Sequence, residues 1–301
     1  MSAIVQRLRA GRFRHVVFAT GMGMRRARNL AAPATEPLER VEALQGEPAA
    51  FLRWLFRRGG LDVNQYRPET LNRRLPACLR ALRTSDVREA RELINSSPEL
   101  TVTALSALVI GVTSFFRDAA TFDELTYHVL PSRKHSRSAA LRIWSVGCSD
   151  GAEPYSIAIL LAELDRLEGA TILGTDCRAD AVVCAREGLY DDHAVRDVPQ
   201  VWLEKYFKKE RGHWRLCQRV RDAVQYRTAD MTQITEPGTW DVILCRNVCM
   251  YFKPECAGRM WERFESSLTP GGFLVLGKAE RPTGTKRLSG VGPCIYRRDR
   301  G

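Results

Sequence analysis

The sequence predicts an α/β fold in which a parallel sheet follows an all-helical N-terminal domain. The first observation is an apolar run at residues 141–146, which leads into a glycine-containing turn and a helix beginning near Glu153. The second is another strand-like run that ends in Asp176. The third is the alternation of strands and helices after residue 141, a pattern that builds parallel sheets. We therefore expect ligand sites at the carboxyl ends of these strands.

The composition is typical of a globular protein with one or two domains. The chain has 301 residues, of which 45% are hydrophobic and 27% are charged, and no apolar run approaches the about 20 residues of a membrane span. A net charge of +11 suits nucleic acid, an anionic membrane surface or an acidic protein, without choosing among them. The nine cysteines are scattered, so we expect reduced thiols, a cytoplasmic protein and no metal site.

Residues 1–36 are predicted to form a disordered basic arm, because arginines surround a short, interrupted apolar patch. Residues 37–109 are predicted to form the helical domain. Its first helix has apolar residues at helical spacing and stops at two glycines, 59 and 60. The second helix contains Pro76, which we expect to kink or split it. Two further helical segments follow, the first of them after a Ser-Asp capping signal.

Arginines are concentrated on the helix that contains Pro76. The four are Arg73, Arg74, Arg80 and Arg83. Two interpretations remain open: the cluster is a solvated helix face, or it is a docking face for an acidic helical partner.

Residues 110–140 are predicted to form a linker and a helix. The linker contains two adjacent aromatic residues followed by Arg117, an arrangement that would serve as a domain hinge. The α/β domain then occupies residues 141–301.

An insertion is predicted at residues 187–230, where the alternation of strands and helices breaks. It contains a short helix near residues 198–207 and two strand-like runs, near 214–216 and 224–227. Basic residues alternate there with Trp and Tyr, which would suit nucleic acid. We favour a small subdomain core.

The glycine turn and the acidic strand end together indicate a ligand of the nucleotide type. Gly147 and Gly151 allow the backbone to approach a ligand closely, and the helix that follows presents free N–H groups. Asp176 lies about 25 residues beyond the turn, close to the spacing at which an acid meets a ribose in dinucleotide folds. The glycine spacing differs from the dinucleotide fingerprint, so an α/β turn without a ligand remains open on this pattern alone.

Four motifs in order make the chain resemble the CheR family of chemotaxis receptor methyltransferases. The resemblance covers roughly residues 46–297. The motifs are GVTSFFR at 111–117, GCSDGAEPYSIA at 147–158, CRNVCMYF at 245–252 and GKAE at 277–280.

The resemblance implies a Rossmann-like, S-adenosylmethionine-dependent methyltransferase domain with an inserted β-subdomain, preceded by a helical domain. It implies methyl transfer to glutamate side chains in the cytoplasmic signalling domain of membrane chemoreceptors. The four arginines would then dock the receptor. The protein would act without nucleic acid or membrane insertion, and as a monomer.

The resemblance also implies the site residues. Arg117 and Tyr251 would lie near the transferred methyl group. Asp176 would accept hydrogen bonds from the ribose, and Glu153 would meet the cationic amino-acid portion of the cofactor. The full cofactor-binding set would be Gly111, Thr113, Arg117, Gly147, Glu153, Asp176, Asp230, Met231, Cys245, Arg246 and Asn247.

Several positions depart from the family pattern. Gly111 stands where the family has an asparagine that touches the cofactor. Asp150 and Ala152 alter the glycine turn, and Lys278 replaces a histidine. The insertion lacks a glycine-rich hairpin loop, so we expect no binding of a receptor's C-terminal pentapeptide. A nucleic-acid methyltransferase and a non-catalytic cofactor-binding module are the alternative functions.

Overall fold

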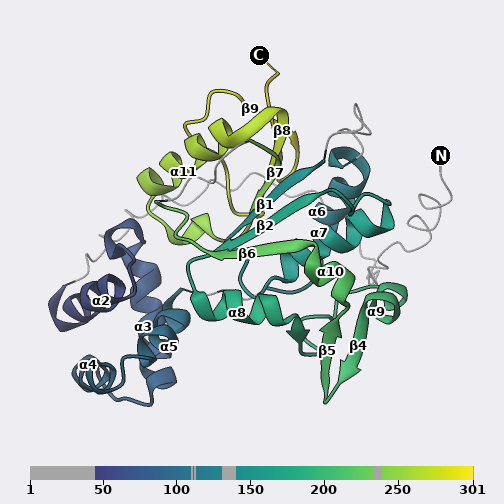
Figure 1. Cartoon of the computed structure of the whole chain (residues 1–301). Helices are drawn as coiled ribbons and strands as arrows, with labels where there is room; N and C mark the ends of the chain where they lie inside the picture. The colour runs from purple at the N-terminus through teal and green to yellow at the C-terminus, as the bar shows by residue number, and fades with distance from the viewer. Residues whose placement is uncertain (1–44, 110, 112, 131–139, 234–238, 301) are drawn as a thin grey trace, which may run out of the picture.

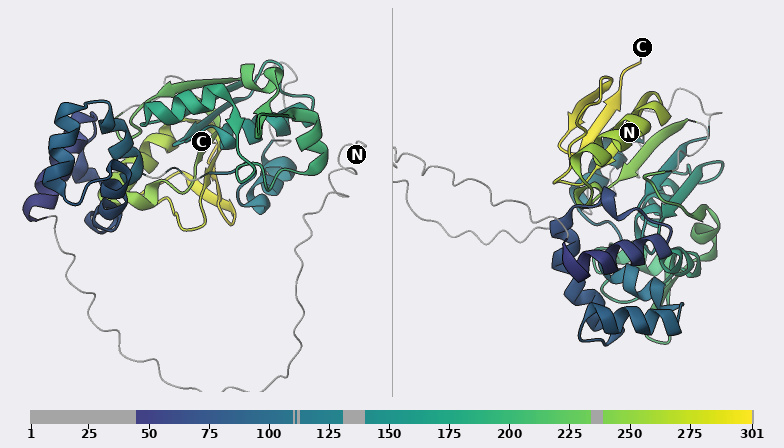
Figure 2. Two further views of the ribbon diagram at one scale, coloured as in Figure 1. Left: turned by 90° about the horizontal axis from the view of Figure 1, so that it is seen from below. Right: turned by 90° about the vertical axis from the view of Figure 1, so that its left-hand side faces the viewer.

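The computed structural model describes residues 45–109, 111, 113–130, 140–233 and 239–300 (Figure 1). The predicted arm at 1–36 lies outside the described residues. A helical domain and a small inserted sheet lie on opposite sides of a central α/β domain (Figures 1 and 2). None of the helices in the described ranges is long and apolar enough to cross a membrane.

In the described residues, the helical domain is built from four α-helices and one 3₁₀ turn. Their bounds are α2 (Gly46–Arg58), η1 (Val63–Gln65), α3 (Pro68–Leu82), α4 (Val87–Ser96) and α5 (Leu100–Leu108). The helical spacing in α2 buries one face, which includes Phe51, Leu52, Leu55 and Phe56. Asp86 caps α4 by accepting hydrogen bonds from the backbone N–H of Arg88 and Glu89. The predicted helices and capping signal are therefore confirmed.

Helix α3 continues through Pro76 as one helix, so the expected split was wrong. A proline in a helix interior costs about 3 kcal/mol because it removes one hydrogen bond and crowds the preceding turn. The buried face of α3, which includes Leu71, Leu75, Cys78 and Leu82, packs in the domain core on both sides of the proline. Burial of this face offsets the cost.

The central sheet has seven strands in the order β6-β2-β1-β7-β8-β10-β9. The first five run parallel, β10 runs antiparallel to β8, and β9 runs antiparallel to β10. The bounds are β1 (Arg142–Val146), β2 (Thr171–Asp176), β6 (Val224–Thr228), β7 (Trp240–Cys245), β8 (Leu268–Leu276), β9 (Leu288–Gly292) and β10 (Ile295–Arg298). The predicted α/β class is confirmed.

Helices cover both faces of this sheet. They are α6 (Ala119–Glu124) with its π-helical continuation η2 (Leu125–Val129), α7 (Ala152–Glu163), α8 (Ala179–Glu187), α10 (Gln218–Asp222) and α11 (Pro254–Ser267). Successive side chains of β1 point to opposite faces of the sheet, as strand geometry requires. Ile143 packs in a core with α6, α7 and α8, whereas Trp144 packs in a core with α11 and the helical domain. The helical domain thus shares a core with one face of the sheet.

The inserted sheet has three strands in the order β3-β5-β4. The insertion comprises β3 (Leu189–Tyr190), α9 (Gln200–Tyr206), β4 (Phe207–Glu210) and β5 (His213–Leu216). The run at 224–227, which the sequence analysis placed in the insertion, is instead strand β6 at the edge of the central sheet. Its alternate residues Val224 and Tyr226 pack in the core of that sheet, and parallel pairing with β2 fixes its position.

The strand order places a ligand site between β1 and β7. From β1 the chain builds outward to β2 and β6, and then returns to the other side of β1 as β7. Loops that leave adjacent strands in opposite directions open a crevice at the carboxyl edge of the sheet. The glycine turn after β1 and the loop after β7 both lie at this edge.

Candidate active site

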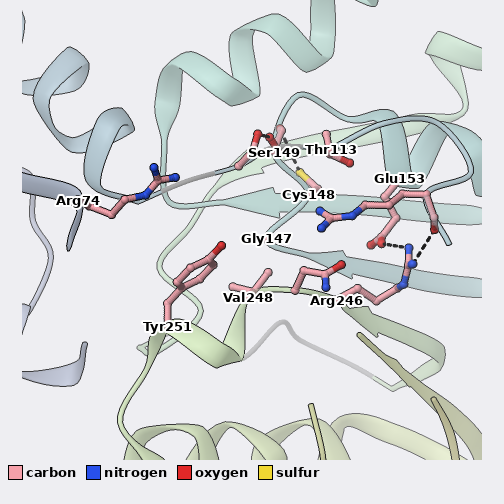
Figure 3. A pocket seen from close by; sticks show the side chains of 12 residues that line it. Arg74, Thr113, Gly147, Cys148, Ser149, Glu153, Arg246, Val248 and Tyr251 are labelled. Atoms are coloured by element: carbon pink, nitrogen blue, oxygen red, sulfur yellow. Dashed lines mark hydrogen bonds and ion pairs between the residues drawn. The ribbon is translucent and has the colours of Figure 1, made fainter. Parts of the chain in front are cut away.

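A cavity of about 250 Å³ lies at the carboxyl ends of β1 and β7 (Figure 3). A smaller space of about 40 Å³ adjoins it beside the end of β2. Four residues line both spaces: Gly111, Gly147, Val248 and Tyr251. We therefore treat the two spaces as compartments of one site.

The glycine turn forms the floor between these compartments. Gly147 has φ +69°, and a Cβ there would lie 2.6 Å from a methyl carbon of Val248. The position therefore requires glycine on both conformational and steric grounds. The backbone N–H groups of Gly147 and Cys148 donate to the carbonyl of Thr175, which ties the turn to the end of β2.

Glu153 and Arg246 form a buried ion pair beside the larger compartment (Figure 3). Glu153 Oε2 accepts from Arg246 Nη1 at 3.0 Å, and Glu153 Oε1 accepts from the Ser145 hydroxyl at 2.8 Å. The guanidinium also donates to the carbonyl of Arg117 and to the carboxylate of Asp118, at 2.6 and 3.1 Å. The Arg246 side chain is 3% exposed, so these contacts lock it in one position.

The linker before α6 holds Arg117 at the cavity. Phe115 packs edge-on against Tyr190 and Phe207 of the inserted sheet, and the Phe116 N–H donates to the buried Ser156 hydroxyl of α7. Phe116 has φ 53°. The aromatic pair is therefore an anchor rather than a hinge, and it positions the residue that follows it.

Asp118 connects the ion pair with the turn after β8. Its carboxylate contacts Arg246 and also Lys278 Nζ, the latter at 2.8 Å. Burial opposes ionisation of Asp118, but these two cations hold its pKa below the ordinary value. Lys278, one of the departures from the family pattern, thus contributes a positive charge at the edge of the site.

The smaller compartment is bordered by two carboxylates. Asp176 ends β2 and accepts from the Ser149 N–H at 2.8 Å and from the Arg178 N–H at 3.0 Å. Asp230 accepts from the Thr232 N–H and hydroxyl, at 2.9 and 2.7 Å. The apolar side chains here belong to Val109, Met231, Val248 and Phe252.

Glu280 organises the loop that follows β7. It is 4% exposed, and its carboxylate accepts hydrogen bonds from the backbone N–H groups of the loop and of its own turn. The donors are the N–H groups of Asn247, Val248, Cys249, Met250 and Gly277. This loop carries Arg246 and Asn247 into the site and leads into the short helix η4 (Cys249–Tyr251).

The helical domain closes one side of the site. The Arg67 N–H donates to the Tyr251 carbonyl at 2.9 Å, and Tyr66 and Phe252 stack with their ring centroids 4.6 Å apart. Arg74 of α3 lines the same compartment as Tyr251, whose hydroxyl points into the cavity (Figure 3). The site is therefore shared between the two domains.

The structure brings together ten of the eleven predicted cofactor-binding residues. Gly111, Thr113, Arg117, Gly147, Glu153, Arg246 and Asn247 line the larger compartment, and Asp176, Asp230 and Met231 line the smaller one. The exception is Cys245, which is 0% exposed. Its side chain is buried in the apolar core, 3.5 Å from the Cys249 sulfur.

Four further residues escaped the sequence analysis as members of the site. Arg74 was assigned only to docking, and Ser149, Arg178 and Glu280 received no role. The GKAE turn was visible as a motif, but nothing in its spacing indicated that Glu280 would bind a loop 30 residues away. Arg178 lies two residues beyond Asp176, but its other partner, Ser149, follows β1, where no local pattern reveals the contact.

The residues present fit the S-adenosylmethionine that the resemblance implies. Gly147, at which any Cβ would fill the site, gives a ligand access to the backbone. The buried Arg246 Nε has no hydrogen-bond partner among the described residues. A carboxylate at the end of β2 suits a ribose diol, and the apolar side chains beside it suit an adenine ring. The carboxylate of Glu153 suits an ammonium group.

Comparisons with known proteins agree with this assignment. Residues 111–291 match the family described as CheR methyltransferase, SAM binding domain. A probable chemotaxis protein methyltransferase of Rhizobium etli is 32% identical over 257 residues, which are 81% of this chain and 96% of that protein. A chemotaxis protein methyltransferase of Listeria monocytogenes is 28% identical over 242 residues, which are 80% of this chain and 92% of that protein.

Solved methyltransferase structures are also similar to the chain. The plantazolicin methyltransferase BpumL, in complex with a triazolic desmethylPZN analog and SAH, is 15% identical. The match covers 69% of this chain and 58% of that chain, with a TM-score of 0.34.

Proposed function

The chain belongs to the CheR methyltransferase family, whose cofactor is S-adenosylmethionine, and from this premise we propose that it is a protein-glutamate O-methyltransferase. Its substrates would be glutamate side chains in the cytoplasmic signalling domain of membrane chemoreceptors. The products would be glutamyl methyl esters and S-adenosylhomocysteine. The protein would act in the cytoplasm, in the adaptation of chemosensory signalling.

The observation that carries this proposal is the set of groups around the larger compartment. Arg74 comes from the helical domain, Arg117 from the linker and Tyr251 from the loop after β7, and all three line one cavity. Two guanidinium groups and a phenol favour a carboxylate over a neutral acceptor. The proposed methyl acceptor is therefore an anionic side chain that binds at the junction of the two domains.

Methyl transfer to a carboxylate requires little of the protein beyond positioning the two reactants. A glutamate with an ordinary pKa of about 4.3 is already ionised at neutral pH, so no general base is required. The cofactor supplies a methyl group activated on a sulfonium sulfur. Arg117 would orient the acceptor carboxylate and balance its charge, and the Tyr251 hydroxyl would donate a hydrogen bond near the reacting oxygen. Orientation and exclusion of water then account for the acceleration.

Docking of the receptor would use the basic face of α3. Arg73, Arg80 and Arg83 are exposed, whereas Arg74 is half-buried beside the cavity. Exposed arginines would speed the encounter with an acidic receptor helix, and salt would weaken the effect. The continuity of α3 through Pro76 supports a single docking face that ends at the site.

We also propose that the inserted sheet does not hold a receptor pentapeptide. Its hairpin turn is Arg211-Gly212, with φ 48° and 85°, so β4 and β5 are joined by a tight two-residue turn. Removing the last five residues of the receptor should therefore leave its methylation rate unchanged. A severalfold loss of rate would contradict this proposal.

The function is tested with methyl-labelled S-adenosylmethionine and membranes that bear chemoreceptors from the same source. We expect label to enter receptor protein, and mild alkali to release it as methanol, because carboxyl methyl esters are alkali-labile. Arg117→Ala serves as the variant expected to lose most activity, and Lys286→Ala, an exposed residue that lines neither compartment, serves as the matched active control.

Two outcomes would contradict the proposal. Alkali-stable label would indicate another acceptor, such as a nucleic acid or a nitrogen atom. Absence of label, with S-adenosylhomocysteine binding intact by calorimetry, would indicate a non-catalytic signalling module.

A further inference from the structure

Position 111 has no room for a Cβ while Arg178 keeps its observed conformation. A Cβ at this position would lie 2.0 Å from Arg178 Nη2 and 2.5 Å from the Ser149 hydroxyl oxygen. A side chain at position 111 and the observed side chain of Arg178 therefore exclude each other.

The side chain of Arg178 is held in this place by two polar contacts. Its Nε donates to Asp176 Oδ1 at 3.2 Å, and its Nη2 donates to the Ser149 hydroxyl at 3.0 Å. The Ser149 hydroxyl in turn donates to the Gly111 carbonyl at 2.8 Å. The Arg178 side chain is only 11% exposed, and it lines the smaller compartment together with Asp176.

In this arrangement Asp176 alone cannot form hydrogen bonds with both hydroxyl groups of a ribose. A carboxylate offers about four lone-pair positions. Three are taken, because Oδ1 accepts from the N–H and the Nε of Arg178 and Oδ2 accepts from the Ser149 N–H. A diol presents two O–H donors and two acceptor oxygens, so one hydroxyl needs a partner other than Asp176.

Arg178 has the donors that this second hydroxyl requires. Its Nη1 makes no hydrogen bond with any part of the chain that the structure describes. A guanidinium has five N–H donors in a fixed plane, so the donors of Nη1 are available to a ligand in the compartment that Arg178 lines.

We propose that Arg178 is a further cofactor-binding residue, which donates a hydrogen bond to one ribose hydroxyl while Asp176 accepts from the other. Gly111 is the complementary substitution, because it leaves the space that the guanidinium occupies. The pair thus takes the place of a side chain at position 111. This inference concerns the cofactor and does not depend on which acceptor is methylated.

The test is calorimetric binding of S-adenosylhomocysteine to the full-length protein. Arg178→Met fills the space without a donor, Arg178→Lys restores a cationic donor, and Arg186→Ala on helix α8, of which Arg178 is the N-cap residue, is the matched control. We expect Arg178→Met to weaken binding about 10- to 100-fold, as for loss of a charged hydrogen bond. Arg178→Lys should recover part of this loss, and the control should bind as the wild type does.

Deoxyribose analogues separate a direct contact from an effect through Asp176. The 2′-deoxy and 3′-deoxy forms of S-adenosylhomocysteine should each bind the wild type more weakly than the parent compound. Arg178→Met should become insensitive to the loss of one hydroxyl and stay sensitive to the loss of the other. If it becomes insensitive to both, Arg178 acts only by holding Asp176, and the proposal is wrong.

A double-mutant cycle tests the link with Gly111. Gly111→Ala should weaken binding in the wild type by pushing the guanidinium away, and should cost less in Arg178→Ala, which leaves the space of the guanidinium empty, so the two effects should not add. Additive effects would contradict the proposal. Tighter binding by Arg178→Met than by the wild type would also overturn it, since Arg178 would then compete with the ribose for Asp176.

Discussion

The side chain of Glu280 is hydrogen-bonded to the backbone of Asn247, with 2.9 Å between Oε2 and the amide nitrogen. Asn247 has φ 58°, a left-handed conformation that is costly for a residue other than glycine. The same carboxylate accepts from the N–H groups of Val248 and Cys249, at 2.9 and 2.7 Å. One buried carboxylate therefore maintains the shape of the loop that bears the catalytic candidate Tyr251.

Replacing Glu280 by alanine should reduce both stability and cofactor binding. The variant leaves several buried N–H donors without an acceptor, at about 1–3 kcal/mol each before relaxation. We expect the free energy of unfolding to fall by about 3 kcal/mol and S-adenosylhomocysteine to bind at least about tenfold more weakly. Urea unfolding and calorimetry measure the two quantities.

The matched control for Glu280 is Glu265→Ala. Glu265 is also a carboxylate that accepts from backbone N–H groups, those of Lys286 and Arg287, but on the exposed surface. It should change neither quantity appreciably. Equal behaviour of the two variants would show that Glu280 has no special role in the site.

Replacing Arg246 by methionine should strongly destabilise the protein. Arg246 is the cationic partner of Glu153 and Asp118 in the interior, and removing one member of a buried pair typically costs about 3–5 kcal/mol. Arg215→Ala breaks the half-exposed pair with Glu210 and should cost less than about 1 kcal/mol. Urea denaturation of both variants tests this, and similar losses would show that burial of the Arg246 pair is unimportant.

Asp150 should make the protein less stable as the pH rises from about 4 to 6. Burial raises the pKa of Asp150 from 3.8 to about 6, although the Ala152 N–H and Arg178 oppose the shift. In this range the folded state retains a proton that the unfolded state has released, so the free energy of unfolding falls with increasing pH. The two-unit shift corresponds to about 3 kcal/mol at most.

Asp150→Asn removes this titration and tests the assignment. The variant should match the wild type near pH 4 and exceed its stability above pH 7. The control Asp86→Asn alters an exposed carboxylate that caps α4, and it should not raise the stability above pH 7. A wild-type profile in Asp150→Asn would mean that Asp150 ionises as an ordinary carboxylate.

Arg117 and Tyr251 should matter for turnover more than for folding. Both side chains line the larger compartment, where the acceptor carboxylate is proposed to bind. We expect Arg117→Ala to lower kcat about 100-fold, Arg117→Lys to recover part of the loss and Tyr251→Phe to lower kcat about tenfold. Single-turnover methylation of receptor membranes measures this. Undiminished turnover in Arg117→Ala would show that Arg117 does not contribute to methyl transfer.

The exposed arginines of α3 should control the encounter with the receptor. The double variant Arg73→Glu/Arg80→Glu should lower kcat/KM about tenfold or more at low salt, and the deficit should shrink as salt is raised. Lys286→Glu/Arg287→Glu makes the same change in net charge on another exposed surface and should have little effect. Equal losses of kcat/KM in both double variants would show that only the net charge matters, and not the position of the arginines.

Local patterns in the sequence determined the secondary structure and the ends of the strands. The apolar run before Gly147, the strand that ends in Asp176 and the cap at Asp86 each involve residues close in the chain, so spacing alone reveals them. The carboxyl edge of a parallel sheet then brings Asp176 and the segment at 245–247 to one place. This is why most of the predicted site residues line the two adjoining compartments.

The tertiary structure alone decided how the side chains of the site are paired. Arg246 meets Glu153 93 residues away, Glu280 meets the loop after β7, and Arg178 occupies the space beside Gly111. It also decided that Pro76 lies within one helix and that residues 224–228 form an edge strand of the central sheet. Such outcomes depend on packing between distant segments, and the free energy of that packing is not expressed in the periodicity of any single segment.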